Sequence, residues 1–250
     1  MARETSLDKA LNVLELIARS GDARLSALAE ATGYPPATIH RTLKALVRRG
    51  YVRQDPFLKA YKIGLKCLEL SSRVRDHLGL VTAARAVMQQ LMEQTGETVN
   101  LVSFENMEAV YIDQLSNTKS LLRMFTRVGA RVPLHSSGVG KAFLSGRPPA
   151  EALDYFRSAK KVRYTKNSLL EEDEFLRDLE ATRTRGYAVD REEFEDGVGC
   201  IAAAITKKGD VAGAMSISGP SSRLFGTNTE RLAAEVVRSA EVIPKQLSGR

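Results

Sequence analysis

Residues 25–52, LSALAEATGYPPATIHRTLKALVRRGYV, contain the turn signals of two short consecutive helices. Gly33 is placed to end the first helix, because glycine adopts the left-handed C-terminal conformation without steric cost. Pro35 and Pro36 suit the first turn of a second helix, where a backbone N–H has no intrahelical partner. The second helix repeats apolar residues at helical spacing, namely Ile39, Leu43, Leu46 and Val47. The pattern predicts a helix-turn-helix over about residues 25–49.

The second helix also carries the side chains expected of a nucleic-acid reader. Away from its apolar stripe lie five polar residues: Thr38, His40, Arg41, Lys44 and Arg48. Residues 50–64 then alternate around a turn at Asp55-Pro56, which indicates a two-stranded wing that carries Arg53. Helix-turn-helix plus basic wing is typical of DNA-binding proteins, and the structural alternative is a small helical packing module.

Another amphipathic helix precedes this module, over about residues 6–19. Its apolar stripe is formed by Leu7, Ala10, Leu11, Leu14 and Ile17.

The positive charge of the chain is concentrated near its N-terminus. Residues 1–80 hold 14 Lys and Arg against 8 Asp and Glu, whereas residues 81–250 hold 23 against 22. Within residues 41–66 the eight basic side chains face only one acid, Asp55. Such a block attracts polyanions by counterion release, although charge alone is equally consistent with a solvated helix face.

Composition narrows the class of protein. The 43% hydrophobic and 27% charged residues are those of an ordinary globular protein. Apolar runs stay shorter than the roughly 18 residues of a membrane helix, and no signal-peptide pattern opens the chain, so we expect a cytoplasmic protein. Cys67 and Cys200 are far apart in sequence, which indicates neither a disulfide framework nor a zinc site.

The rest of the chain predicts linker helices followed by an α+β domain. Residues 67–95 have helical periodicity with a break near Gly79, and their apolar stripe could pack against the second domain or a partner chain. Two strand pairs follow, at about residues 97–115 and 198–218. A last helix is expected from about residue 228 to 242, before Pro244. We expect helices packed on an antiparallel sheet.

The segment His135–Gly146, HSSGVGKAFLSG, shares four letters with a phosphate-binding loop. That loop needs a first glycine where this chain has His135, and a magnesium-binding hydroxyl where it has Ala142. The sequence therefore argues against nucleotide hydrolysis. The backbone N–H groups that enter a helix here suit a carboxylate, and close helix packing through Gly138 and Gly140 is the alternative.

Several segments resemble the IclR family of bacterial transcriptional regulators. They include residues 6–18, 25–52 and 61–70, and the similarity continues over nearly the whole chain. The resemblance implies a winged helix-turn-helix domain over residues 1–66, linker helices over 67–95, and a GAF- or profilin-like α+β domain over 96–250. The last would bind a small-molecule effector and form a homodimer or a dimer of dimers.

The resemblance also assigns residues to two sites. Residues of about 36–44 would enter the major groove of an operator, and the DNA-binding set comprises Pro36, Ala37, Thr38, His40, Arg41, Lys44, Arg48 and Arg53. Many relatives carry Lys and Ser where this chain has Pro36 and Ala37, which leaves fewer side chains for base contact. The effector set comprises Leu122, Met124, Ser137, Gly138, Val139, Asp190, Cys200, Ser216 and Ser218.

Together these residues suit a small carboxylic or sugar acid. We expect no catalytic residue, cofactor or metal. Many relatives have Arg before the cysteine, where this chain has Gly199. If that Arg supports the pocket or an interface, this chain does so differently. The alternative function is an enzyme that uses Cys200 as nucleophile and His135 as base, although Cys200 sits among small apolar residues typical of an inert thiol.

Overall fold

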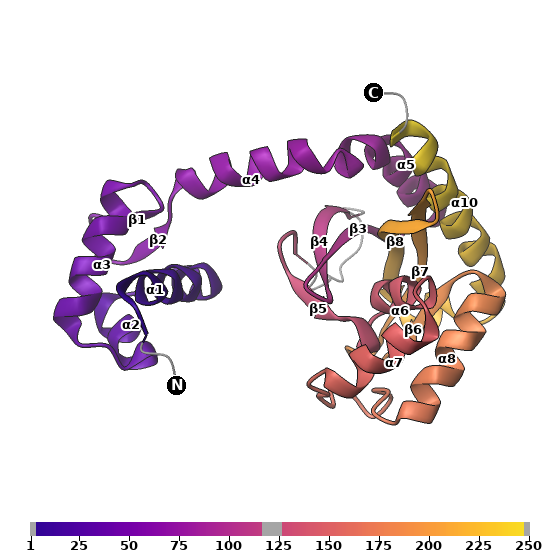
Figure 1. Ribbon diagram of the computed structural model, residues 1–250. Helices are drawn as coiled ribbons and strands as arrows, with labels where there is room; N and C mark the ends of the chain where they lie inside the picture. The colour runs from indigo at the N-terminus through magenta and orange to yellow at the C-terminus, as the bar shows by residue number, and fades with distance from the viewer. Residues whose placement is uncertain (1–3, 117–126, 248–250) are drawn as a thin grey trace. The chain divides into compact units, whose positions relative to one another are not determined.

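The computed structural model describes residues 4–116 and 127–247. It divides the chain after His77 into two units, whose helices and strands are labelled in Figure 1. The fold is the expected one: an N-terminal helix-turn-helix unit is followed by an α+β unit. No helix within the described residues is long and apolar enough to span a membrane.

The first unit is a winged helix-turn-helix built around a small apolar core. Gly33 ends α2 in the left-handed conformation at φ 70°, and Pro36 occupies the first turn of α3, as the sequence predicts. The two strands of the wing pair antiparallel, with Arg53 opposite Lys62. The elements are α1 (Ser6–Ser20), α2 (Leu25–Thr32), α3 (Pro36–Arg48), β1 (Val52–Gln54) and β2 (Tyr61–Ile63).

Two helices connect the wing to the sheet. Gly79, at φ 60°, separates α4 (Leu65–Leu78) from α5 (Leu80–Thr95), which confirms the expected break. The apolar stripe of α5 packs into the core of the second unit. Of the two partners that the sequence left open, the second domain is therefore the one that the stripe contacts. The stripe residues that join this core are Leu80, Ala84, Val87, Leu91 and Met92.

The second unit is an antiparallel sheet covered by helices on both faces. Its described strands follow the spatial order β5-β4-β3-β8-β7-β6. Figure 1 places α5 and α10 on one face and α6, α7 and α8 on the other. The strands are β3 (Thr98–Glu105), β4 (Glu108–Leu115), β5 (Arg131–Pro133), β6 (Ala188–Arg191), β7 (Val198–Lys207) and β8 (Asp210–Pro220). The helices are α6 (Gly138–Ser145), α7 (Pro149–Ser158), α8 (Glu172–Arg185), α9 (Ser221–Leu224) and α10 (Thr229–Leu247), with a 3-10 turn at Leu134–Ser136.

The expected end of the last helix is wrong. Pro244 lies inside α10, which continues to Leu247. A proline within a helix loses one backbone hydrogen bond, and here Ile243 remains fully buried against the core beside it. Tertiary packing of the apolar face therefore outweighs the local stop signal.

Candidate functional site

One face of the first unit gathers the basic side chains predicted to read a nucleic acid. Because Ile39 and Leu43 point into the core, the opposite face of α3 turns outward. That outward face exposes Pro36, Ala37, His40, Arg41, Lys44 and Arg48, with Thr38 half-buried. In the described part of the chain, Arg41, Lys44 and Arg48 have no carboxylate partner and remain available to phosphates or base edges.

A groove runs between α3 and the wing. Its volume is about 570 Å³, and its lining combines four of the predicted residues with neighbours from both elements. The lining residues are His40, Arg41, Lys44, Ala45, Val47, Arg48, Gln54 and Tyr61. Arg53 lies on β1 and is exposed outside this lining. The structure thus brings four of the eight predicted residues together around one positively charged hollow.

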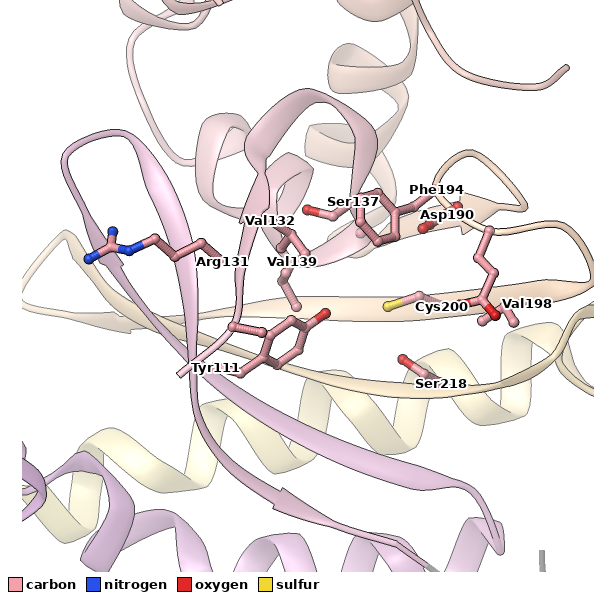
Figure 2. Close-up of a pocket in the computed structure, with 13 residues that line it drawn as sticks. Tyr111, Arg131, Val132, Ser137, Val139, Asp190, Phe194, Val198, Cys200 and Ser218 are labelled. Atoms are coloured by element: carbon pink, nitrogen blue, oxygen red, sulfur yellow. The ribbon is translucent and has the colours of Figure 1, made fainter. Parts of the chain in front are cut away.

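A cavity of about 170 Å³ lies in the second unit, between the start of α6 and the sheet (Figure 2). An engineered apolar cavity of about 150 Å³ holds a benzene molecule, so the space suits a ligand of one small ring or a short acid. Its lining residues are Tyr111, Ala130, Arg131, Val132, Ser137, Gly138, Val139, Asp190, Phe194, Glu195, Val198, Cys200 and Ser218.

Glycines and a capping serine position the N-terminus of α6 at the cavity. Ser137 Oγ accepts the Gly140 N–H at 3.2 Å and donates to the Pro133 carbonyl at 2.9 Å. A Cβ on Gly140 would lie 2.2 Å from Leu134 Cα, so only glycine lets the chain pass this closely. Gly138 and Val139 line the cavity, and their N–H groups belong to the first turn of α6, where backbone donors have no intrahelical partner. They suit an anionic group.

The opposite wall is a row of side chains across three strands. Asp190 of β6 pairs with Cys200 of β7, and Cys200 pairs with Ser218 of β8. Directly paired residues point to the same face of a sheet, so all three reach the cavity from separate segments of the chain. Ser216 is one step further along β8, fully buried, and contacts the Asn100 amide rather than the cavity.

The environment at this wall shifts the pKa of the Asp190 carboxyl into the neutral range. Burial raises the pKa of Asp190 to about 7, and the negative charge of Glu193 adds to the effect while Lys141 opposes it. Its Oδ1 accepts the Glu193 N–H at 2.7 Å. Near neutral pH this side chain therefore exchanges between a carboxylate and a neutral carboxyl that donates a hydrogen bond.

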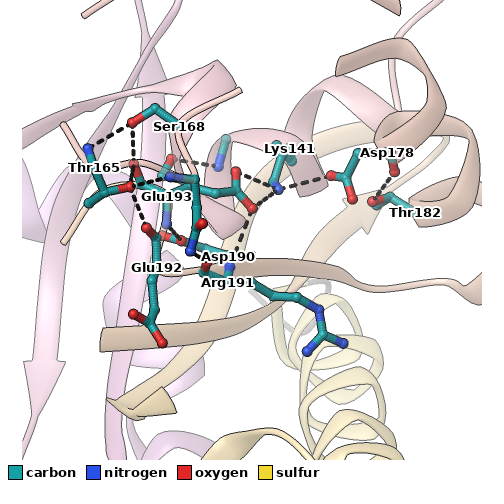
Figure 3. A network of polar contacts seen from close by, with 12 residues as sticks. Lys141, Thr165, Ser168, Asp178, Thr182, Asp190, Arg191, Glu192 and Glu193 are labelled. Carbon is teal, nitrogen blue, oxygen red and sulfur yellow. Dashed lines mark hydrogen bonds and ion pairs between the residues drawn. The ribbon is translucent and has the colours of Figure 1, made fainter. Parts of the chain in front are cut away.

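A buried ion-pair cluster stands behind Asp190 (Figure 3). Lys141 is 0% exposed, and its Nζ lies 2.6 Å from Glu193 Oε1 and 2.9 Å from Asp178 Oδ2. Burial alone would lower the pKa of Lys141, but the two carboxylates outweigh it and leave the pKa raised. Lys141 is thus a charged, buried lysine of α6 that is paired with α8 and with the segment after β6. Its ammonium group is not available to a nucleotide phosphate.

The cysteine and histidine of the enzyme alternative are not paired. Burial, with the Asp190 charge second, raises the pKa of Cys200 to about 12, and its hydrogen-bond partners are Ser216 and Ser218. His135 lines a separate hollow, where its Nδ1 lies 3.2 Å from Tyr155 Oη. A thiol kept protonated and separated from the proposed histidine base lacks the arrangement that activates a nucleophile at neutral pH.

Two segments of the chain, one in the N-terminal and one in the C-terminal part, match domains of one protein family. Residues 6–56 match the "IclR helix-turn-helix domain", and residues 72–245 match "Bacterial transcriptional regulator IclR C-terminal". The chain belongs to the IclR family of bacterial transcriptional regulators. The first match lies within the first structural unit, and the second match covers most of the second unit together with the end of α4.

Individual relatives agree with this assignment. The chain is 34% identical over 248 residues to the transcriptional repressor IclR of Escherichia coli K12, covering 98% of this chain and 90% of that protein. It is 35% identical over 236 residues to the HTH-type transcriptional regulator BhcR of Paracoccus denitrificans, covering 94% and 84% respectively.

Solved structures of IclR proteins share the whole fold. The Thermotoga maritima IclR structure is 31% identical, with a TM-score of 0.80, and covers 96% of this chain and 98% of its own. An IclR homologue from Microbacterium hydrocarbonoxydans, complexed with 4-hydroxybenzoate, has a TM-score of 0.85 over 98% of this chain and all of its own. At 22% identity, the second likeness concerns the fold alone.

The effector set drawn from the IclR resemblance divides into three groups. Six of its residues line the cavity: Ser137, Gly138, Val139, Asp190, Cys200 and Ser218. Ser216 is not among the lining residues but contacts Cys200 and the Asn100 amide, and Leu122 and Met124 lie outside the described residues. Sequence reasoning missed Tyr111 of β4 and Phe194 of the β6–β7 connection. The residues next to them in sequence show only the alternation of a strand or a polar loop, so they give no indication of a binding site. Both side chains reach the cavity only because the folded sheet brings β4 and the β6–β7 connection to the start of α6.

Proposed function

We propose that this IclR-family chain binds an operator duplex through α3 and the wing, and that a small organic or sugar acid in the second unit changes that affinity. The observation that carries the proposal is the cavity, in which the start of α6 faces Asp190, Cys200 and Ser218. The amides suit a carboxylate, and the Ser218 hydroxyl and the Asp190 carboxyl suit ligand hydroxyl or carbonyl groups.

The proposal includes a homodimer or a dimer of dimers in the cytoplasm, where the operator is found. One α3 helix touches too few base pairs for a long site, and two-fold operators match two-fold proteins. The exposed apolar side chains of α4 support self-association, since a second copy would cover them. They are Leu65, Leu68, Leu70 and Val74.

Arg41 is expected to be essential for tight operator binding. Arg41→Ala should weaken binding about 5- to 150-fold, because a bidentate arginine contact to guanine is worth about 1–3 kcal/mol. The probe is the duplex that the full-length protein enriches from a random-sequence pool, measured by fluorescence anisotropy.

The matched control for this experiment is Arg19→Ala. Arg19 is an exposed arginine on α1 whose ion-pair partner among the described residues is Glu15, so its loss should leave affinity within twofold of the parent. Equal binding by Arg41→Ala and the parent would remove α3 from the proposed interface.

The affinity for an anionic acid is expected to depend on pH through Asp190. A ligand carboxylate is repelled by ionised Asp190, so the complex takes up a proton above the pKa of about 7. Affinity should therefore hold below pH 7 and fall by up to about tenfold per unit above it. Calorimetry with 4-hydroxybenzoate and a panel of aliphatic and sugar acids at pH 6, 7 and 8 measures this dependence.

Asp190→Asn is the control for the pH dependence, since its amide cannot ionise. The variant should bind the same acid equally at pH 6 and 8. Burial raises the pKa values of Cys200 and Tyr111 beyond this range. Burial also raises the pKa of Glu195 at the cavity, so a pH dependence that persists in Asp190→Asn would assign the effect to Glu195. A parent protein whose affinity rises with pH would contradict the assignment.

A further inference from the structure

The turn between β1 and β2 holds an aromatic ring out in solvent. Phe57 is 93% exposed, more than any other large apolar residue in the described ranges, and its neighbour Leu58 is exposed as well. The α3 helix and the wing core make no use of either side chain. A ring presented in this way at the tip of a wing has no structural role inside the first unit.

Hydrogen bonds within the turn nevertheless restrain its backbone. Asp55 Oδ1 accepts the N–H groups of Phe57 and Leu58, each at 2.9 Å, and these bonds lower the pKa of Asp55. The Lys59 N–H donates to the Asp55 carbonyl at 3.0 Å, and Pro56 fixes its own φ angle within the same turn. Little conformational entropy is left to lose when Phe57 meets a partner, which favours binding.

The surroundings of the ring indicate which partner it meets. Arg53 and Lys59 flank the turn on the wing, and the groove beside it is lined by Arg41, Lys44 and Arg48. An apolar ring surrounded by cations complements a polyanion that also has an apolar interior. Duplex DNA is such a partner, with phosphates outside and stacked bases within.

We propose that Phe57 is a wedge that inserts between two base pairs in the minor groove beside the site read by α3. The inference rests on the proposed operator binding. Arg48 and Gln54 line the groove between α3 and the wing, so with α3 in the major groove they would meet the phosphate backbone, and the tip of the wing would reach the neighbouring minor groove. Phenylalanine is among the side chains that unstack a base step there and kink the duplex away from the minor groove.

This wedge has a consequence for sequence preference. Pyrimidine–purine steps such as TA and CA/TG unstack most easily, so the operator should carry one at the position under each wing. Phe57 thereby selects sequence through deformability, without a hydrogen bond to any base.

The test uses the full-length protein and the duplex it enriches from a random pool. The fluorescent base 2-aminopurine replaces each adenine of the flanking steps in turn, since its emission rises when it unstacks, and circular permutation of the site measures the bend. The parent should unstack one step per half-site and bend the duplex. Phe57→Ala should lose both signals and bind roughly 5- to 10-fold more weakly, because the lost contact is partly offset by the unstacking no longer required.

Arg53→Ala is the matched control on the same wing. It should keep the unstacking and the bend, and lower the slope of log affinity against log salt by about one, as expected for a lost phosphate contact. Phe57→Ala should leave that slope unchanged. Phe57 is exposed, so circular dichroism should report the same thermal transition for the variant and the parent.

Two failures can be told apart. If the parent enriches no duplex, operator binding fails and the wedge with it. If the parent binds, and Arg41→Ala weakens it, but Phe57→Ala retains the affinity, the bend and the 2-aminopurine signal, the wedge alone is overturned. Loss of self-association in Phe57→Ala with DNA binding intact would likewise overturn it, and would assign the ring to a second copy of the chain.

Discussion

Replacing Lys141 by methionine is expected to destabilise the second unit by about 3–5 kcal/mol at neutral pH. Methionine fills much of the space of the lysine stem but leaves Glu193 and Asp178 without the cation that they share. Glu193 is buried, so its unpaired charge has no water to solvate it. Urea unfolding followed by far-ultraviolet circular dichroism measures the loss, in which only the transition of the second unit should move.

Part of that loss should be recovered at lower pH. Without Lys141 the pKa of Glu193 in the folded state lies further above its unfolded value, so the folded state binds more protons, and stability rises as pH falls toward about 5. Lys141→Met combined with Glu193→Gln should likewise be more stable than Lys141→Met alone. The exposed Lys166→Met serves as control, with a change within about 0.5 kcal/mol. A loss below about 1 kcal/mol for Lys141→Met would contradict the account of this cluster.

Replacing Gly138 by leucine is expected to abolish the response to the acid while DNA binding persists. A Cβ at this position would lie 3.0 Å from Cys200 Sγ and 3.5 Å from Ala202 Cβ, so a larger side chain is forced against the cavity wall. Overpacking costs about 1–3 kcal/mol of stability, which a folded domain can tolerate.

The measurement for Gly138→Leu is the thermal shift with and without the acid. At a hundredfold excess over its Kd, the acid should stabilise the parent by about 2.7 kcal/mol, which raises the melting temperature by roughly 5–10 °C. Gly138→Leu should show no shift, whereas Ala150→Leu, an exposed position on α7, should keep the full shift. An undiminished shift in Gly138→Leu would place the ligand elsewhere.

Local chemistry made much of the fold predictable. Gly33, the prolines before α3 and the break at Gly79 act through their own backbone preferences, so the helix-turn-helix and the division of the linker could be read directly. The strand pairs β3–β4 and β7–β8 followed from apolar runs around short turns. Such signals do not depend on the rest of the chain.

Other features depended on packing that no local pattern encodes. The predicted stripe of α1 included Leu7 and Leu11, yet both are exposed, and Val13 with Ile17 fills the core. The role of Lys141 was equally hidden, because its partners come from α8 and the β6–β7 connection, 37 and 52 positions along the chain. Only the folded structure brings those carboxylates to α6.

The cavity residues likewise combine features that local sequence predicts with an arrangement that only the folded structure shows. The capping Ser137 and the glycines of α6 signalled a helix start suited to an anion, and the family resemblance supplied Asp190, Cys200 and Ser218. Their arrangement as one row depends on the register of three strands, which joins positions 190, 200 and 218. Register is a tertiary property, since a slip of one residue would turn the row to the other face of the sheet.

The central claim is that occupancy of the cavity changes operator affinity. The most direct test titrates the enriched duplex with the full-length protein, with and without the acid that gives the largest thermal shift. Coupling of about 1–3 kcal/mol would change the Kd for DNA by about 5- to 150-fold in the parent and leave it unchanged in Gly138→Leu. Identical DNA affinity of the parent with and without a saturating acid would contradict the account.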